Sequence, residues 1–253
     1  MNRTLIITGC IEPVKQNFLK ILDVNERLEQ YIESVEYYIK ESLCEHIIFC
    51  ENSDYKYDSS QLMELARENK KNFEWISFKG NQLLVQQRGK GIGEGEVIDY
   101  AISNSKFEIE QIEKVTGRLI IKNIQKIEKK LKSKTYINAD VYIFHDGKSF
   151  DTRFYACSLD TYIKDISPSY RKSNDSDNKN IERLLYKKLA DSKCTPGYPM
   201  FKGKSGGFGY EYEEKFFRTK CLNMLCELGL YNHYTIRRIV RKLLYLIDRK
   251  RVV

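Results

Sequence analysis

The chain has 253 residues, of which 42% are hydrophobic and 31% are charged, and its formal net charge is +8. These proportions are typical of a globular protein with a substantial core, and they exclude a disordered chain. The positive excess favours an anionic partner, which leaves nucleic acid, nucleotide phosphates and acidic lipid as candidates.

Strands and helices are expected to alternate along the first eighty residues. Apolar, β-branched runs at 4–8, 46–50 and 73–78 predict buried strands, and the segments 17–41 and 61–69 predict helices. This order indicates an α/β fold with a Rossmann-like, mostly parallel sheet flanked by helices. The polar turns after the three strands should therefore meet at one edge, where such sheets bind ligands. The turn residues singled out are Thr8, Gly9, Glu51, Asn52, Asp54, Lys79 and Gly80.

A glycine-rich stretch at 90–96 precedes an expected helix at 97–105. We predict a loop whose backbone N–H groups bind phosphate at the helix N-terminus. No Lys-Ser or Lys-Thr follows these glycines and they do not follow the first strand, so a P-loop and a dinucleotide-binding motif are both disfavoured. An ordinary helix entrance, in which glycines permit close packing, is the alternative. The candidate residues are Lys90, Gly91, Gly93, Glu94 and Gly95.

Three more strands are predicted at 117–121, 141–144 and 150–156, and a helix at 181–189. Side chains two apart on a strand share a face, so Asp151 and Arg153 either line a cleft together or form a solvated ion pair. The segments 173–179 and 194–210 are predicted loops. Glycines and aromatic residues in the second loop suggest a mobile lid whose aromatic side chains stack on the rings of a ligand. Those aromatic residues are Tyr198, Phe201, Phe208 and Tyr210.

The end of the chain, 236–253, predicts a basic amphipathic helix with apolar residues at helical spacing. It could lie on an anionic membrane surface, or it could pack on the domain with its arginines in solvent. We divide the chain into a main domain at 1–212 and a C-terminal helical segment at 213–253.

The seven cysteines form no C-x-x-C pair and the three histidines have no ligand spacing, so no metal site is predicted from them. The chain has no run of about 18 apolar residues and no signal-peptide pattern. We expect a cytoplasmic protein, with the basic helix allowing peripheral contact with the inner face of the membrane.

Five short motifs together resemble those of bacterial surface-polysaccharide glycosyltransferases of the GT-A type, the capsule and O-antigen kind. They are Glu51-Asn52-Ser53-Asp54, Lys90-Gly91-Ile92-Gly93-Glu94-Gly95-Glu96, Lys114-Val115-Thr116-Gly117-Arg118, Asp151-Thr152-Arg153 and Ile181-Glu182. The resemblance spans about residues 4–190. It implies a GT-A fold, a nucleotide-sugar donor, and a glycan or lipid-linked glycan acceptor in capsule or lipopolysaccharide biosynthesis, with the motif residues on the donor side.

One departure from that family concerns the metal. GT-A enzymes usually carry Asp-x-Asp after the fourth strand, where it holds Mg²⁺ or Mn²⁺ against the diphosphate. Here the place is taken by Lys114, Thr116, Gly117 and Arg118, without an acidic pair. Our hypothesis is that Lys114 and Arg118 neutralise the leaving diphosphate. Dependence on Mg²⁺ or Mn²⁺ through other ligands stays open.

Inverting transfer needs a base for the acceptor hydroxyl. The resemblance favours Glu182, at the start of a helix, and places Asp151 second; a first-turn acid that complements the helix dipole is the alternative for Glu182. Two other functions are kept: a nucleotidyltransferase, whose acids for Mg²⁺ are not found, and a nucleic-acid-binding module that uses the basic C-terminal helix, whose binding would be strongly salt-dependent.

Overall fold

The computed structural model describes residues 2–14, 21–139, 148–189, 191–204, 211–212 and 216–249. Its centre is a six-stranded sheet in the order β3-β2-β1-β4-β7-β6. The strands are β1 (Arg3–Gly9), β2 (His46–Glu51), β3 (Asn72–Ser77), β4 (Gln111–Thr116), β6 (Tyr136–Ala139) and β7 (Phe150–Ser158). The first four run parallel, and β7 is antiparallel to both of its neighbours. The α/β prediction with a mostly parallel sheet is confirmed.

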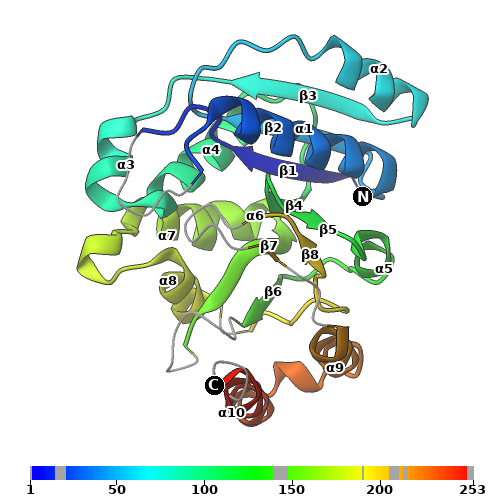
Figure 1. Ribbon diagram of the computed structural model, residues 1–253, viewed down its shortest axis with the longest axis vertical. Helices are drawn as coiled ribbons and strands as arrows, with labels where there is room; N and C mark the ends of the chain where they lie inside the picture. Colours follow the sequence, from blue (N-terminus) through cyan, green and yellow to red (C-terminus); the bar gives the residue numbers. More distant parts are fainter. Residues whose placement is uncertain are drawn as a thin grey trace.

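Helices cover both faces of this sheet (Figure 1). On one face β1 and β2 contribute Leu5 and Phe49 to a core with α1 (Val24–Glu41) and α2 (Ser60–Glu68). On the other face Ile6 and Ile48 pack with α4 (Lys90–Asn104). Adjacent residues such as Leu5 and Ile6 serve opposite cores because side chains alternate along a strand. The sheet is thus buried on both faces, which explains the continuous apolar runs of β1 and β2.

The remaining elements extend these two layers. The α4 side of the sheet also carries α3 (Gln82–Arg88), α6 (Leu159–Thr161), the π-helix η1 (Tyr162–Ile166), α7 (Ser167–Lys172), the 3₁₀ turn η2 (Asp175–Asp177) and α8 (Ile181–Lys188). A small two-stranded sheet joins β5 (Ile120–Ile121) to β8 (Phe201–Lys202), and α5 (Ile124–Glu128) follows β5.

A helical pair lies at the end of the described chain: α9 (Phe216–Glu227), the 3₁₀ turn η3 (Leu230–Asn232) and α10 (Tyr234–Arg249) (Figure 1). It has its own small core, in which Leu222, Cys226 and Tyr231 pack with Cys194 and Tyr198. The amphipathic helix predicted at 236–253 is confirmed as far as residue 249, whereas the domain boundary at 212 stays a prediction. Within the described ranges, no helix combines the length and hydropathy needed to cross a bilayer.

Two predictions about local structure are wrong. The stretch 90–96 is not a loop, because it forms the first two turns of α4. The fourth strand of the sheet is Gln111–Thr116 rather than 117–121, of which only two residues pair, in β5. Glu113 and Lys114 interrupt the apolar pattern of β4, although both are buried. The predicted strand 141–144 lies outside the described residues.

Candidate active site

The turns after β1, β2 and β3 converge at the carboxyl edge of the sheet, as predicted. In the parallel register Gly9 lies opposite Glu51, and Glu51 lies opposite Ser77. Beyond the strands, the Ser53 hydroxyl accepts hydrogen bonds from the backbone N–H groups of Ile11 (3.2 Å) and Glu12 (3.0 Å). These bonds join the first two turns into one rim.

Glu51 fixes the turn after β2 from inside the protein. Its side chain is completely buried and accepts from the backbone N–H groups of Ser53 (2.8 Å) and Tyr55 (2.9 Å), and from the hydroxyls of Ser53 and Ser77. A carboxylate that accepts four hydrogen bonds has its oxygens fully engaged within the protein. Glu51 was expected to contact the nucleotide-sugar donor directly, but its side chain instead positions the turn.

Other predicted residues of the same rim lie beside this turn. The backbone N–H of Gly80 donates to the carbonyl of Asn52 (3.0 Å), and the backbones of Lys79 and Ser53 form an isolated antiparallel β-bridge. The Asp54 carboxylate accepts from the Lys56 ammonium (2.7 Å), and this pair lies on the exposed side of the turn. Asn52 and Lys79 are thus grouped at the rim, while Asp54 is engaged with a neighbouring lysine.

The glycines of α4 serve packing rather than phosphate binding. A Cβ atom at Gly95 would lie 2.3 Å from Cβ of Tyr170, and one at Gly91 would lie 3.0 Å from the Ser173 hydroxyl. The Asp175 carboxylate accepts from the Lys90 backbone N–H (3.2 Å) at the start of the helix. That end of α4 is therefore capped by a side chain, and the alternative of a closely packed helix entrance describes these glycines.

A buried ion pair beneath the rim links four predicted residues. The Lys114 ammonium is completely buried and donates to Glu94, to the Thr116 hydroxyl (3.1 Å) and to the carbonyl of Thr152 (2.8 Å). Glu94 also accepts from the hydroxyls of Thr8 (3.2 Å) and Tyr170 (3.1 Å). This network joins β1, β4, β7, α4 and α7, so Lys114 is not open to a leaving diphosphate, contrary to the hypothesis.

Arg118 lies at the rim, where β4 gives way to the next turn. Gly117 allows β1 and β4 to approach closely, because a Cβ there would be 2.4 Å from the Thr8 carbonyl oxygen. The half-buried Arg118 guanidinium donates to the Gln30 amide oxygen (3.2 Å) and lies 5.9 Å from the Tyr31 ring centroid. It also lines a hollow of about 520 Å³ whose charges are mixed, because the lining includes Lys202 and Lys204 as well as Glu26, Glu29, Glu33 and Glu211.

Lys90 belongs to a mixed-charge group at this edge. Exclusion of water by surrounding protein lowers the pKa of Lys90 below its ordinary value, the Asp175 carboxylate opposes this, and Arg118 adds to the lowering. The Glu182 carboxylate also acts on it, to raise the pKa. Lys90 is thus within electrostatic range of Arg118 and of Glu182.

Asp151 and Arg153 share a face of β7, as the strand spacing predicts. The guanidinium contacts the carboxylate at two points (2.8 and 2.6 Å) and stacks between the rings of Phe201 (4.3 Å) and Tyr212 (4.9 Å). Burial disfavours the charged guanidinium, but Asp151 holds the pKa of Arg153 well above its ordinary value. Asp151 is therefore a poor candidate base, since its oxygens are committed to a cation.

Glu182 lies in the first turn of α8 and is half-buried. Its Oε1 atom is 3.5 Å from the hydroxyl of Thr152, the residue that also accepts from Lys114 through its carbonyl. Glu182 on α8 thus lies against β7 and next to the buried ion pair, whereas both oxygens of Asp151 contact Arg153.

Sequence reasoning missed several residues that hold the rim. Arg27 donates to the carbonyls of Cys10 (2.9 Å) and Ile21 (3.1 Å), which fixes the chain after β1. Tyr170 and Asp175 hold α4. Arg27 sits in an otherwise amphipathic helix and no local pattern marks its burial.

Burial raises the pKa of the nearby Cys10 thiol to about 11, so this thiol is neutral and not an activated nucleophile.

The predicted lid is only partly described. Tyr198 and Phe201 are buried, Tyr198 in the core of the helical pair and Phe201 against Arg153. Their rings are therefore not available to stack on a sugar, contrary to the prediction. Phe208 and Tyr210 lie outside the described residues.

Of the protein-family models and curated proteins compared with this chain, none matches. Among solved structures it is similar to the glycosyltransferase GlyE of Streptococcus pneumoniae TIGR4, with 13% identity and a TM-score of 0.49 over 76% of this chain and 44% of that one. It is also similar to the bifunctional glycosyltransferase WbbM, with 9% identity and a TM-score of 0.45 over 73% and 37% of the two chains.

A third similar structure is a putative glucose-1-phosphate thymidylyltransferase from Bacillus anthracis, with 12% identity and a TM-score of 0.39 over 74% and 83% of the two chains. The chain spans less than half the length of GlyE and WbbM. At TM-scores below 0.5, these likenesses do not decide between sugar transfer and nucleotidyl transfer.

The Lys114–Glu94 pair should be a main determinant of stability. We expect Lys114→Met to lower the free energy of unfolding by about 3–5 kcal/mol, because it leaves a largely buried carboxylate without its countercharge. The double variant Lys114→Met, Glu94→Gln should recover part of this loss. Urea denaturation followed by circular dichroism measures both. Lys164→Met, which breaks an exposed pair with Asp160, is the control and should change little. Equal losses in Lys114→Met and in the control would contradict the assignment.

Proposed function

We propose that this protein is a glycosyltransferase that moves a sugar from a nucleotide-sugar donor to a glycan or lipid-linked glycan acceptor. The observation that carries the proposal is the convergence of the turns after β1, β2 and β3 at the carboxyl edge of the sheet, where Arg118 follows β4 and Glu182 contacts Thr152 of β7. Such a rim offers groups for a nucleoside, cations for a diphosphate and a carboxylate for an acceptor hydroxyl. The motif resemblance supports bacterial surface polysaccharide as the product and a GT-A type of fold.

For the donor, we assign the nucleoside to the turn of Asn52 and Lys79 and the diphosphate to Arg118. Glu51 and Ser53 fix the turn, so that its groups are preorganised before a ligand arrives. A guanidinium can engage two phosphate oxygens at once, which suits it to the leaving group. Among the described residues, the contacts that define the position of Arg118 are a neutral amide and an aromatic ring, neither of which neutralises its charge.

The residues at the end of β4 do not fit a divalent cation. Thr116, Gly117 and Arg118 supply no carboxylate, and Glu94, which accepts from the Thr116 hydroxyl (3.4 Å), has its oxygens engaged by Lys114, Thr8 and Tyr170. Hard cations such as Mg²⁺ require several free oxygen ligands. We therefore route no step through a metal at this place and assign charge neutralisation to Arg118.

For the acceptor, we assign Glu182 as the general base of an inverting displacement. The acceptor hydroxyl gives its proton to the Glu182 carboxylate as its oxygen bonds to the anomeric carbon, and the bond from that carbon to the diphosphate oxygen breaks. The electron pair of the broken bond leaves with the diphosphate, where Arg118 faces the new charge. Thr152, 3.5 Å from the carboxylate, holds it in place.

Two other functions remain testable. A nucleotidyltransferase would use the same rim, but it needs acids for Mg²⁺ that the end of β4 does not supply. A nucleic-acid-binding module would use α10, and its affinity would fall steeply with added salt.

The C-terminal helices also suggest a partner. On α10, Val240 packs against the core of the helical pair, whereas Ile239 and Leu243 are more than half exposed, next to the exposed Arg238 and Lys242. Exposed apolar groups beside cations suit the interface of an anionic membrane, where each basic group contributes about 1 kcal/mol. We propose peripheral binding to such a surface, which would bring a lipid-linked acceptor within reach.

Nucleotide binding tests the donor assignment. We expect UDP, GDP or CMP to raise the melting temperature of the wild-type protein, and we expect Arg118→Gln to weaken the same ligand about tenfold or more, because a charge-assisted phosphate contact is lost. Arg67→Gln, at an exposed position on α2, is the matched control. A shift with oligonucleotides but not with nucleotides would favour the nucleic-acid function, and equal affinities in the two variants would reject Arg118.

Turnover tests the base. With the donor found by that screen, Glu182→Gln should fold normally and release nucleoside diphosphate at least about 10²-fold more slowly, because a neutral amide cannot take the proton. Glu108→Gln, an exposed substitution, should leave the rate unchanged. A near-normal rate for Glu182→Gln would exclude it as base. Loss of turnover with EDTA that Mg²⁺ restores would show that a metal ion, bound by side chains away from the end of β4, takes part.

Flotation with liposomes tests the membrane partner. We expect wild-type protein to float with vesicles that contain anionic lipid and not with neutral vesicles, because the basic groups of α10 need a negative surface. The double variant Ile239→Ser, Leu243→Ser should lose this binding, whereas Met63→Ser, which removes an exposed apolar side chain on α2, should keep it. Equal flotation of both variants, or none by the wild type, would contradict the proposal.

A further inference from the structure

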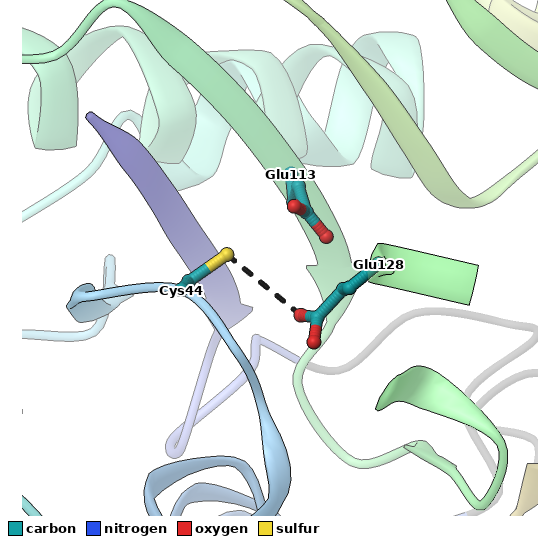
Figure 2. Close-up of side chains that lie close together, drawn as sticks. All are labelled: Cys44, Glu113 and Glu128. Carbon is teal, nitrogen blue, oxygen red and sulfur yellow. Dashed lines mark hydrogen bonds between the residues drawn. The ribbon is translucent and has the colours of Figure 1, made fainter. Parts of the chain in front are cut away.

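Three ligand-type side chains meet at the amino ends of the parallel strands, away from the rim. Cys44 lies two residues before β2, Glu113 lies on β4 and Glu128 ends α5. All three are buried, and one ligand atom from each lies within 4.8 Å of the others. Figure 2 shows the three side chains directed toward a common space, with the Cys44 thiol donating to Glu128 (3.7 Å). They come from segments distant in sequence.

Glu113 is the unusual member of the cluster. Its side chain is 2% exposed, yet neither carboxylate oxygen has a hydrogen-bond partner in the part of the chain that the structure describes. The Arg3 guanidinium lies 3.4 Å away, but its hydrogen bond goes to the backbone carbonyl of Glu128 (2.8 Å). By contrast, Glu128 accepts from the Ser42 hydroxyl (2.6 Å) and the Leu43 backbone (2.6 Å). A buried carboxylate without donors is costly unless another ligand binds it.

We propose that Cys44, Glu113 and Glu128 bind a divalent cation of the Zn²⁺ class. As ligands, the thiolate and the two carboxylates together with the Arg3 guanidinium carry a net charge of about −2, which a divalent cation neutralises. The thiol proton of Cys44 leaves to solvent as the sulfur–metal bond forms. Sulfur favours a borderline-soft ion such as Zn²⁺ over Mg²⁺ or Ca²⁺, which bind oxygen alone. The inference is independent of the proposed transfer reaction.

The distances suit a four-coordinate ion after a small adjustment. Zinc bonds of about 2.3 Å to sulfur and 2.0–2.2 Å to oxygen place tetrahedral ligand atoms roughly 3.5 Å apart. The 3.7 Å between Cys44 and Glu128 is close to this value, and the ligand atom of Glu113 lies within 4.8 Å of both. A hollow of about 500 Å³ lined by Arg3, Glu113 and Glu128 gives a path for the ion and for a water as fourth ligand.

The bound ion would act on the fold. It would tie the start of β2, the middle of β4 and the end of α5 together at the edge of the sheet opposite the rim. The alternative is that a proton relieves the repulsion between the two acids, since burial and the Glu128 carboxylate raise the pKa of Glu113 to about 8. Metal uptake distinguishes the two explanations, because a protonated pair binds no cation.

The test is a titration of the reduced, chelator-treated full-length protein with Co²⁺ and Zn²⁺. We expect one Co²⁺ per chain with a thiolate-to-metal absorption band, displacement by Zn²⁺, a higher melting temperature with Zn²⁺, and no such rise with Mg²⁺. Cys44→Ser should lose the absorption band, and Glu113→Gln should weaken binding about tenfold or more. Without metal, Glu113→Gln should be at least as stable as wild type, so weak binding in that variant cannot be ascribed to unfolding.

Cys194→Ser is the matched control, because Cys194 is another buried thiol that lies next to Cys226 in the core of the helical pair and not in the Cys44 cluster. Cys194→Ser should bind Co²⁺ like the wild type. No uptake by the wild type, uptake that Cys44→Ser and Glu113→Gln retain, or loss of the band in Cys194→Ser would each overturn the proposal.

Discussion

The salt bridge between Lys114 and Glu94 is the interaction on which the candidate site depends. The Lys114 ammonium and the Glu94 carboxylate are largely buried in the middle of the fold. The residues of this pair and those that hydrogen-bond to it come from β1, β4, β7, α4 and α7. Such a pair is weak evidence of extra stability, but it requires all five elements to lie in one arrangement. Thr8, Thr116 and Thr152 connect the pair to the rim, so the positions of Arg118 and Glu182 follow from the charges below them.

Much of the fold could be predicted from the sequence, because β1, β2 and β3 are apolar runs followed by polar turns. The prediction failed where burial and polarity disagree. β4 carries Glu113 and Lys114 side by side, one on each face, and a period-2 pattern cannot show that Lys114 pairs with Glu94 or that Glu113 is buried beside Arg3. Glycines at 91, 93 and 95 predict a loop when only their neighbours in sequence are known, because two of their contacts, Tyr170 and Ser173, lie about eighty residues later.

The sequence predicts where the turns of the candidate site lie better than it predicts the role of each residue in them. Convergence of the turns follows from parallel strand order, which local patterns indicate. The role of each residue depends instead on which way its side chain points and which groups it contacts. Glu51 points into the protein, Asp151 is held by Arg153, and Glu182 remains next to Thr152. The Cys44 cluster had no sequence signal at all, because its three members have no regular spacing and only the sheet brings them together.

The attachment of the second turn through Glu51 bears on how such a protein could diverge. The carboxylate fixes the backbone of the turn from the interior, and the side chains of Asn52 and Lys79 take no part in those bonds. Lys79 is exposed, so its replacement leaves those bonds in place and the proposed nucleobase contact could drift among relatives, whereas the buried Asn52 packs against Gly80 and is more constrained. Gly95 and Gly117 have no such freedom, because any side chain there meets Tyr170 or the backbone of β1.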